Sequence, residues 1–423
     1  MSNAFSKEER VAFEDILEGF NDALVLSKNV SIYRTDGSMM ERTNNVLWRP
    51  MPYIAQSFSG MDQTLNFTDF TQLSVPATLG FSRSVPWTMD ALELRDALQE
   101  GRLGDAAKQK LASDINLAIM NVAANLGSLV VTRTGAAGDY DDVAACDTIM
   151  NEQGVQQFDR FLALSSRDYN GMAGNLAVST RSFGNRISDE ALRRGMVGMV
   201  AGFETYKFDY ANRIRAAGAG GDTTMSTLTA AGNYWVPKAT TTAVTGETSN
   251  VDNRFQTITV VGTTNYRAGD AITIAGVNAV HHITKSDTGE LKSFRVVSVT
   301  NGTQMVITPA IVSNQGGTDA EAQYQNCVVT PNATATVDRL NVNATQINCF
   351  WQKDALEILP GRYAVPTNAG ANVMRASTDQ GIELVMQKEY DINNMKTKFR
   401  LDVLFGVVNK QPEMSGILLF NQP

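Results

Sequence analysis

The residues best suited to bind a metal ion or transfer a proton are few, and their spacing suits neither task. The chain has two histidines, His281 and His282, which are adjacent in a stretch with strand-like patterning. Successive residues of a strand face opposite sides, so two adjacent imidazoles on a regular strand cannot bind one metal ion together. The pattern predicts two ordinary strand residues and no metal site.

Motifs with a fixed spacing for phosphate binding or nucleophilic catalysis do not occur in the sequence. Residues 218–221 match a phosphate-binding loop in composition alone and lead into threonine-rich sequence rather than a helix, which favours a linker. Asp141 and Asp142 are adjacent on an expected helix and point about 100° apart, which favours a solvated face over a catalytic pair. We predict a protein that is not an enzyme and uses no cofactor.

Composition disfavours several further classes. The net charge of -8 disfavours a basic face that grips nucleic-acid phosphates. No run of about 18 apolar residues is present, and the first 13 residues lack the apolar core of a signal peptide. Cys146, Cys327 and Cys349 are too widely spaced for a zinc site or a disulfide framework, which predicts buried thiols. These features predict a globular protein of a cytoplasm, without a membrane segment.

One long helix is the element on which the rest of the chain would be built. Apolar residues recur at helical spacing over residues 105–126, Asp105 can cap the first turn, and Gly127 stands where a left-handed C-terminal cap is expected. The β-branched residues 129–132 then predict a strand. A shorter helical piece is expected within residues 87–104.

Two segments before this helix need support from other parts. Residues 6–26 combine a capping box and an apolar stripe with an acidic face that includes Glu14, Asp15 and Glu18; water or a basic partner helix could cover that face. Residues 53–81 alternate between apolar and polar types and predict a long two-stranded hairpin. An isolated hairpin is marginally stable, so it should lie on its own body or on a neighbour.

The remaining sequence divides by composition. Short helices at 139–153, 166–176 and 188–194 with a strand at 161–164 predict a compact α/β region. Residues 222–345 contain 24 threonines in 124 residues and show strand-like runs at 255–261, 271–277, 293–299 and 304–308, which predicts an inserted all-β barrel or sandwich. Mixed patterning returns at residues 346–359, and closing strands are expected at 381–390, 398–408 and 416–420.

Several strings resemble, in this order, the coat proteins of short-tailed phages that build their shells around a scaffolding protein. They are NVLWRP at 45–50, NVAANLGSLVVT at 121–132, FGNRI at 183–187, VAGF at 200–203, VDNRF at 251–255, IAGV at 274–277 and NCFW at 348–351. No single string is diagnostic, but the ordered set extends along nearly the whole chain.

The resemblance implies an α+β protein with the Hong Kong 97-like capsid fold and an inserted all-β barrel. It implies an N-terminal arm (1–44), an extended loop (52–75), a peripheral domain (76–130) with a spine helix (105–126), an axial domain (131–221 and 346–380), the inserted barrel (222–345) and C-terminal strands (381–423) that return to the peripheral domain.

The resemblance also implies a major capsid protein of the virion, assembled in the host cytoplasm. With a scaffolding protein it would form an icosahedral procapsid of hexamers and pentamers, with a portal protein as a further partner. The shell would expand on packaging and enclose double-stranded DNA without sequence-specific binding. Candidate contact residues are Glu14, Asp15 and Glu18 for the scaffold; Phe58, Asp62, Phe67, Asp69 and Phe70 for a neighbouring subunit; and Lys238 and Glu247 for a neighbouring capsomer.

Lys238 and Glu247 are the only charged residues of the insert loop, residues 238–250, which predicts a weak or differently paired contact. Two other classes remain open. A bacterial encapsulin-like compartment would share the fold but normally lacks the inserted barrel. An extracellular binding module would use the threonine-rich insert and would need a secretion signal.

Overall fold

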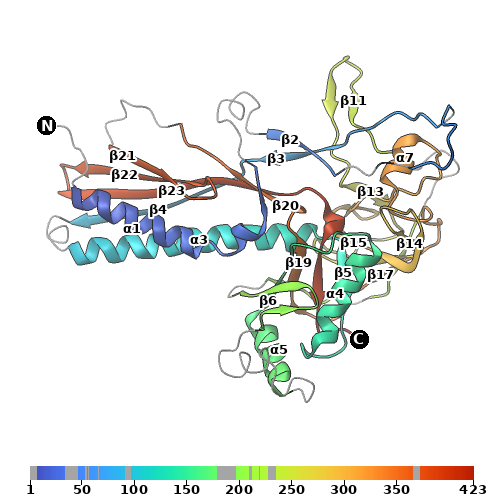
Figure 1. Ribbon diagram of the computed structural model, residues 1–423, viewed down its shortest axis with the longest axis horizontal. Coiled ribbons are helices and arrows are strands. Elements are labelled where there is room, and N and C mark those ends of the chain that lie inside the picture. The colour runs from blue at the N-terminus through green and yellow to red at the C-terminus, as the bar shows by residue number, and fades with distance from the viewer. Residues whose placement is uncertain are drawn as a thin grey trace. The chain divides into compact units, whose positions relative to one another are not determined.

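The computed structural model describes residues 7–33, 46–52, 55, 57–64, 66–90, 97–178, 197–208, 212–218, 220–226, 235–364 and 372–423 (Figure 1). Its mixture of helices and sheets confirms the predicted α+β class. Contacts divide the chain into two compact units. The first comprises Met1–Leu47, Pro76–Ile119 and Leu356–Val408; the second comprises Trp48–Val75, Met120–Ala355 and Asn409–Pro423.

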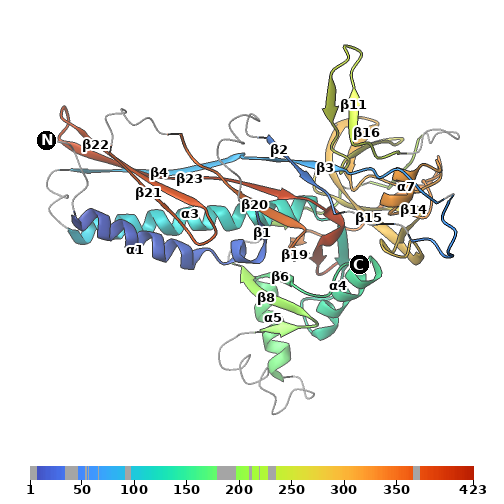
Figure 2. The same cartoon turned by 45° about the horizontal axis from the view of Figure 1, so that its top comes forward.

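The first unit is a sheet with two helices along one face (Figures 1 and 2). Its strands are β1 (Ser31–Ile32), β4 (Phe81–Asp90), β20 (Leu356–Pro360), β21 (Asn372–Ser377), β22 (Glu383–Asp391) and β23 (Lys396–Asn409). β23 pairs antiparallel with both β22 and β4. Phe399, Leu401 and Val403 are buried while Arg400 between them is exposed, as the alternating sequence predicts.

The two helices are α1 (Lys7–Ala23) and α3 (Ala97–Leu126). α3 therefore begins before Asp105, which lies inside the helix and is not its cap. A Cβ on Gly104 would lie 2.6 Å from Cδ1 of Ile16, so glycine at this position allows α1 to approach α3 closely.

The short helix expected within residues 87–104 is wrong at residues 87–90, whereas residues 97–104 belong to α3 and residues 91–96 lie outside the described residues. Trp87 to Asp90 form the end of β4, where Trp87 stacks on Phe399 of β23 with ring centroids 5.6 Å apart. Cross-strand aromatic pairing of this kind stabilises a sheet. η1 (Leu26–Asn29) follows α1, while β2 (Val46–Pro50) and β3 (Ser74–Thr78) form a separate two-stranded sheet.

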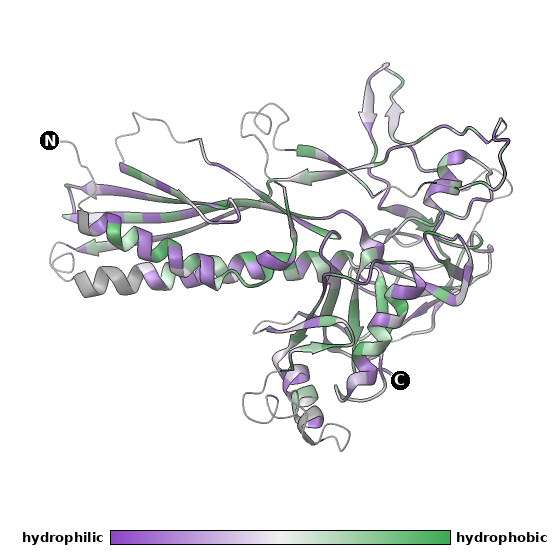
Figure 3. Ribbon diagram, in the orientation of Figure 1, coloured by the Kyte–Doolittle hydropathy of each residue, from purple (hydrophilic) through white to green (hydrophobic). Residues whose placement is uncertain are grey.

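The second unit contains a six-stranded sheet with a buried apolar core. Its strands, in spatial order, are β5 (Leu129–Thr132), β24 (Ser415–Leu419), β19 (Asn348–Gln352), β6 (Arg160–Ser165), β8 (Phe203–Phe208) and β7 (Met199–Val200). α4 (Tyr140–Glu152) and α5 (Ser166–Val178) contribute to the same core, whose strands are rich in apolar residues (Figure 3). These elements confirm the predicted helices at 139–153 and 166–176 and the strand at 161–164; residues 188–194 lie outside the described residues.

Gly127 shows how tertiary contact replaces the predicted local role of a residue. Its φ is not positive, so the expected left-handed cap is wrong. A Cβ on Gly127 would lie 2.7 Å from the Ala123 carbonyl oxygen and 3.0 Å from the Gly416 nitrogen. Glycine is required here because β24, which carries Gly416, pairs directly with β5.

The threonine-rich region folds into a six-stranded sheet that closes on itself. Its strands, in spatial order, are β10 (Thr223–Thr224), β17 (Thr336–Arg339), β14 (Ala271–Val280), β15 (Asp287–Asn301), β16 (Gln304–Thr308) and β13 (Gln256–Thr259). Met225 and Val260 form an antiparallel bridge where the two edge strands end. Ser226 N donates to Thr259 O at 3.1 Å and Val261 N donates to Thr224 O at 2.9 Å. The sequence left a barrel and a sandwich as alternatives, and these contacts between the two edge strands show a barrel.

Smaller elements surround this barrel. β9 (Arg213–Ile214) pairs with β18 (Thr345–Gln346), and β11 (Thr240–Thr242) pairs with β12 (Thr248–Asn250). The region is not purely β, because α7 (Asp319–Tyr324) forms a short helix within it, opened by a capping box between Thr318 and Glu321. η4 (Pro412–Met414) precedes β24.

Candidate assembly surfaces

The acidic face of α1 is exposed. Phe13, Ile16 and Phe20 are buried, whereas Glu14, Asp15 and Glu18 point away from that apolar stripe and are accessible. A different acid, Glu9, is buried and forms an ion pair with Lys388 of β22, which fastens α1 to its sheet. The helix therefore uses one carboxylate for its own packing and leaves the three predicted contact residues together on an open face.

The loop formed by residues 57–73 presents large apolar side chains to solvent. Phe67 is 89% exposed and Phe70 59% exposed, and Phe58 and Met61 are also exposed. Such a set of accessible apolar groups is typical of a surface that becomes covered in an assembly.

Asp62, another predicted contact residue, has a local role in this loop. Its carboxylate accepts hydrogen bonds from the Thr64 hydroxyl at 2.6 Å and the Thr64 amide at 3.0 Å. These bonds lower the pKa of Asp62. Gly60, with a φ of +106°, allows the chain to turn just before it. Asp62 therefore stabilises the turn that carries the apolar residues.

The prediction that residues 53–81 form a two-stranded hairpin is wrong. The described residues between 57 and 73 contain no strand, and β3 begins only at Ser74. The backbone of residues 69–73 bonds instead to side chains of α7, including Asp319, which accepts from the Asp69 amide at 3.2 Å. Side chains of the barrel region thus occupy the place of the expected partner strand.

The predicted insert loop is the β11–β12 hairpin, which extends from the barrel (Figures 1 and 2). Residues 240–250 are all exposed, including Glu247, and Lys238 is exposed at the base. The Asn253 side chain closes this base, because it accepts from Lys238 N at 3.0 Å and donates to Lys238 O at 2.8 Å. Within the described part of the chain, no ion pair joins Lys238 to Glu247, and both residues are well placed for an external contact.

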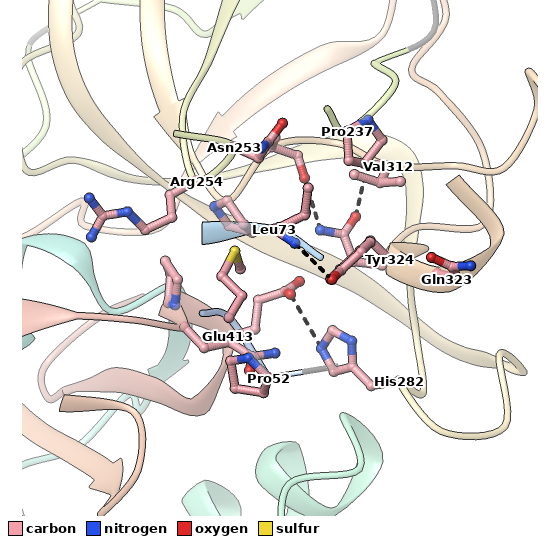
Figure 4. A pocket seen from close by; sticks show the side chains of 16 residues that line it. Pro52, Leu73, Pro237, Asn253, Arg254, His282, Val312, Gln323, Tyr324 and Glu413 are labelled. Atoms are coloured by element: carbon pink, nitrogen blue, oxygen red, sulfur yellow. Dashed lines mark hydrogen bonds and ion pairs between the residues drawn. The ribbon is translucent and has the colours of Figure 1, made fainter. Parts of the chain in front are cut away.

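A buried charged cluster, which the sequence did not predict, lies beside a cavity in the second unit (Figure 4). β14 ends at Val280, so His281 and His282 lie in a turn and the prediction of strand residues is wrong. His282 Nε2 lies 3.5 Å from Glu413 Oε2, and Lys292 Nζ lies 2.5 Å from Glu413 Oε1. More than a hundred residues separate the histidine from this carboxylate, so no spacing rule could connect them. The available signal was an acidic residue, Glu413, in a short segment between two apolar runs, residues 403–408 and 416–420.

Three further predictions concern metal sites, membrane-spanning segments and the state of the cysteines. The part of the chain that the structure describes contains no group of three side chains arranged to hold a metal ion, and no helix in it is long and apolar enough to cross a membrane. Cys146, Cys327 and Cys349 are buried free thiols, as predicted. Burial raises the pKa of Cys327 and of Cys349 to about 12, which keeps both protonated and unreactive.

Several solved structures are similar to this chain. The CUS-3 coat protein I-domain is 35% identical and covers 29% of this chain and 99% of that chain, with a TM-score of 0.22. A structure from Mycobacterium phage Che8 is 10% identical and covers 93% of this chain and 90% of that chain, with a TM-score of 0.43. The asymmetric unit of the bacteriophage PhiM1 mature capsid is 11% identical and covers 93% and 85% of the two chains, with a TM-score of 0.44.

The architecture has the parts of the Hong Kong 97-like plan with an inserted barrel: an N-terminal helical arm, a long helix against a sheet, an extended loop and a closed barrel within a second sheet domain. The family model described as P22 coat protein, gene protein 5, matches residues 1–421. The match covers nearly every residue of the chain, and the chain therefore belongs to the P22 coat protein family.

Proposed function

We propose that this protein is the major capsid subunit of a tailed, double-stranded DNA phage. It assembles with a scaffolding protein into a procapsid of hexamers and pentamers, accommodates a portal protein, expands on packaging and encloses the genome in the virion. The observation that carries this proposal is the family match over residues 1–421. Assembly takes place in the host cytoplasm.

The domain plan given by the sequence resemblance is part of the proposal. The arm comprises residues 1–44, the extended loop 52–75, the peripheral domain 76–130 with the C-terminal strands 381–423, the axial domain 131–221 and 346–380, and the insert 222–345. The order of helices, loop and barrel supports this plan, although the compact units divide the chain at other residues. The last strand, β24, pairs with β5 and β19 in the second unit rather than with the sheet of the first.

Three surfaces supply the contacts. The acidic face of α1, with Glu14, Asp15 and Glu18, binds a basic segment of the scaffolding protein. The apolar residues of loop 57–73 lie over a neighbouring subunit. The β11–β12 hairpin, flanked by Lys238 and carrying Glu247, meets a neighbouring capsomer. The exposure of all three surfaces supports these roles.

The mechanism is multivalent burial of surface rather than catalysis. Each contact is modest, so a wrongly placed subunit can leave, but many contacts per subunit act together in a closed shell. The net charge of -8 also suits a subunit that encloses a polyanion without gripping it.

Co-expression with a scaffolding protein, followed by sedimentation and electron microscopy, tests the proposal. Closed shells that form only with the scaffold are the expected result. Free monomers under every condition would contradict it. Shells that form without scaffold and contain cargo enzymes would favour the encapsulin-like compartment instead.

A further inference from the structure

The last residues of the loop, 69–73, are bonded through their backbone to three side chains of α7. The Asp69 amide donates to Asp319 Oδ2 (3.2 Å), and Gln323 Nε2 donates to the Asp69 carbonyl (2.7 Å). The Thr71 amide donates to Gln323 Oε1 (3.3 Å), and the Tyr324 hydroxyl donates to the Thr71 carbonyl (2.9 Å). The Leu73 amide donates to the Tyr324 hydroxyl at 3.3 Å (Figure 4).

These five hydrogen bonds follow the pattern of a sheet edge. An extended chain directs the N–H and C=O groups of alternate residues to one side, and the bonded groups here belong to residues 69, 71 and 73. In a sheet, another backbone would satisfy them. Here, Asp319, Gln323 and Tyr324 satisfy them from a helix. Because the contacts reach backbone atoms only, they recognise an extended conformation rather than particular loop side chains.

α7 is held firmly enough to position these side chains. At its start, the Glu321 carboxylate accepts from the Thr318 amide at 3.1 Å, and the Thr318 hydroxyl accepts from the Glu321 amide at 3.3 Å. At its end, Lys285 Nζ donates to the carbonyls of Gln323 (3.0 Å) and Gln325 (3.1 Å), as suits a cation at a helix C-terminus. Both ends of a six-residue helix are thereby fixed within the barrel region.

The loop segment is anchored at its far end as well. Leu73 is buried, and its carbonyl accepts from the Met51 amide at 2.9 Å. Phe70 and Phe67, three and six positions earlier in the chain, are exposed. The change from buried to exposed occurs along the stretch that α7 binds.

We propose that Asp319, Gln323 and Tyr324 form a strand clamp, through which the inserted barrel anchors the extended loop of its own subunit. The clamp sets the direction in which Phe67 and Phe70 leave the body to meet a second copy of this chain. The contact of Phe67 and Phe70 with a second copy rests on the proposed shell function. The insert then controls a contact made by residues about 250 positions earlier in the sequence, besides any contact that its own hairpin makes.

Tyr324→Phe tests the clamp, because it removes the hydroxyl and leaves the ring. Tyr266→Phe is a matched control: the Tyr266 hydroxyl also accepts from one backbone amide, Thr223 N at 3.0 Å, and donates to one backbone carbonyl, Val337 O at 2.5 Å, but it does so inside the barrel. Residue-resolved hydrogen exchange on the purified subunit is the measurement. We expect the Leu73 amide to exchange roughly five-fold faster in Tyr324→Phe, the effect of losing a typical hydrogen bond. Tyr266→Phe should leave Leu73 unchanged.

Thr71→Pro provides a second variant if changes in α7 impair folding. It removes the amide that Gln323 accepts from and alters no residue of the barrel. We expect faster exchange at Asp69 and Leu73 with the thermal transition of the barrel retained. Unchanged exchange at Leu73 in Tyr324→Phe, or at both amides in a folded Thr71→Pro, would overturn the clamp.

Assembly of the Gln323→Ala/Tyr324→Phe double variant tests the positioning step. With scaffold present, we expect fewer closed shells and more aberrant particles than for the wild type and for Tyr266→Phe. Normal shells from a variant with a released loop would overturn the positioning role. Failure of the wild type to assemble would instead contradict the shell function, while the exchange result would still decide whether the clamp exists.

Discussion

His282 Nε2 lies 3.5 Å from Glu413 Oε2 in the interior of the second unit, and the same carboxylate binds Lys292. Burial lowers the pKa of His282 to about 4; the Glu413 carboxylate opposes this shift, while Lys292, Lys285 and His281 add to it. Burial alone would raise the pKa of Glu413, but the charge and hydrogen bond of Lys292, together with His282 and Lys285, outweigh burial and lower this pKa. The histidine is therefore neutral at physiological pH.

This pair makes stability depend on pH. Below about pH 6.5 the unfolded chain binds a proton at His282 that the folded chain does not bind, so the free energy of unfolding falls between pH 6.5 and about 4. The expected loss from His282 at pH 5 is about 2 kcal/mol. Glu413 acts in the same direction in stronger acid, because stability from its lowered pKa is lost as pH falls from 4.5 through the folded value.

Urea unfolding at pH 7 and pH 5 measures this dependence. His282→Gln, which cannot take up the proton, should show a smaller loss between the two pH values than the wild type. An equal loss in both proteins would mean that His282 is not the group responsible. His281→Gln is the control, since His281 is only partly buried.

The ion pair between α1 and the sheet should contribute measurably to stability. Lys388→Met removes the cation beside Glu9, whose side chain is only 10% exposed, so we expect a loss of about 1 to 3 kcal/mol in the free energy of unfolding. Lys398→Met is the matched control. Its ion pair with Asp391 lies on the surface, with the lysine 53% exposed, and its loss should cost less than about 1 kcal/mol. Equal effects of the two changes would contradict the packing role of Glu9.

Charge reversal on the exposed face of α1 should affect assembly and not folding. Glu18→Lys leaves the buried stripe of α1 intact, so the melting temperature should stay within a few degrees of the wild type, as is usual for surface changes. Binding to the scaffolding protein should weaken by roughly ten-fold at low salt, with a smaller effect at high salt. Pull-down or calorimetry measures the affinity. Glu290→Lys, at an exposed acid in the barrel, makes the same charge change and should leave scaffold binding intact.

The β11–β12 hairpin should loosen when its base is opened. Asn253→Ala removes the bonds to the amide and carbonyl of Lys238 and a third to the Val251 carbonyl at 3.1 Å. We expect the free energy of unfolding to fall by about 1 to 3 kcal/mol and trypsin to cleave faster after Lys238. Glu247→Ala, at an exposed site, should change neither stability nor cleavage. If cleavage is unaffected by Asn253→Ala, the side chain does not hold the hairpin.

The amino-acid sequence by itself determined the elements whose formation depends on local spacing. α4, α5, β5 and β24 lie within a residue or two of their predicted bounds, because apolar periodicity and capping residues such as Asp139 act over one or two turns of chain. The exposed acids of α1 follow from the same periodicity. The ordered strings along the chain indicated the coat protein family, which the family match then established.

Only the tertiary structure decided the features that join distant residues. Met225 and Val260 close the barrel, and Gly416 lies so near Gly127 that a side chain there would not fit. Tyr324 binds a loop that the alternating pattern had assigned to a hairpin. Glu413 lies beside His282 for the same reason: folding brings together side chains that no local rule relates. An extended backbone needs hydrogen-bond partners, but its own sequence does not specify whether another strand or a helix side chain provides them.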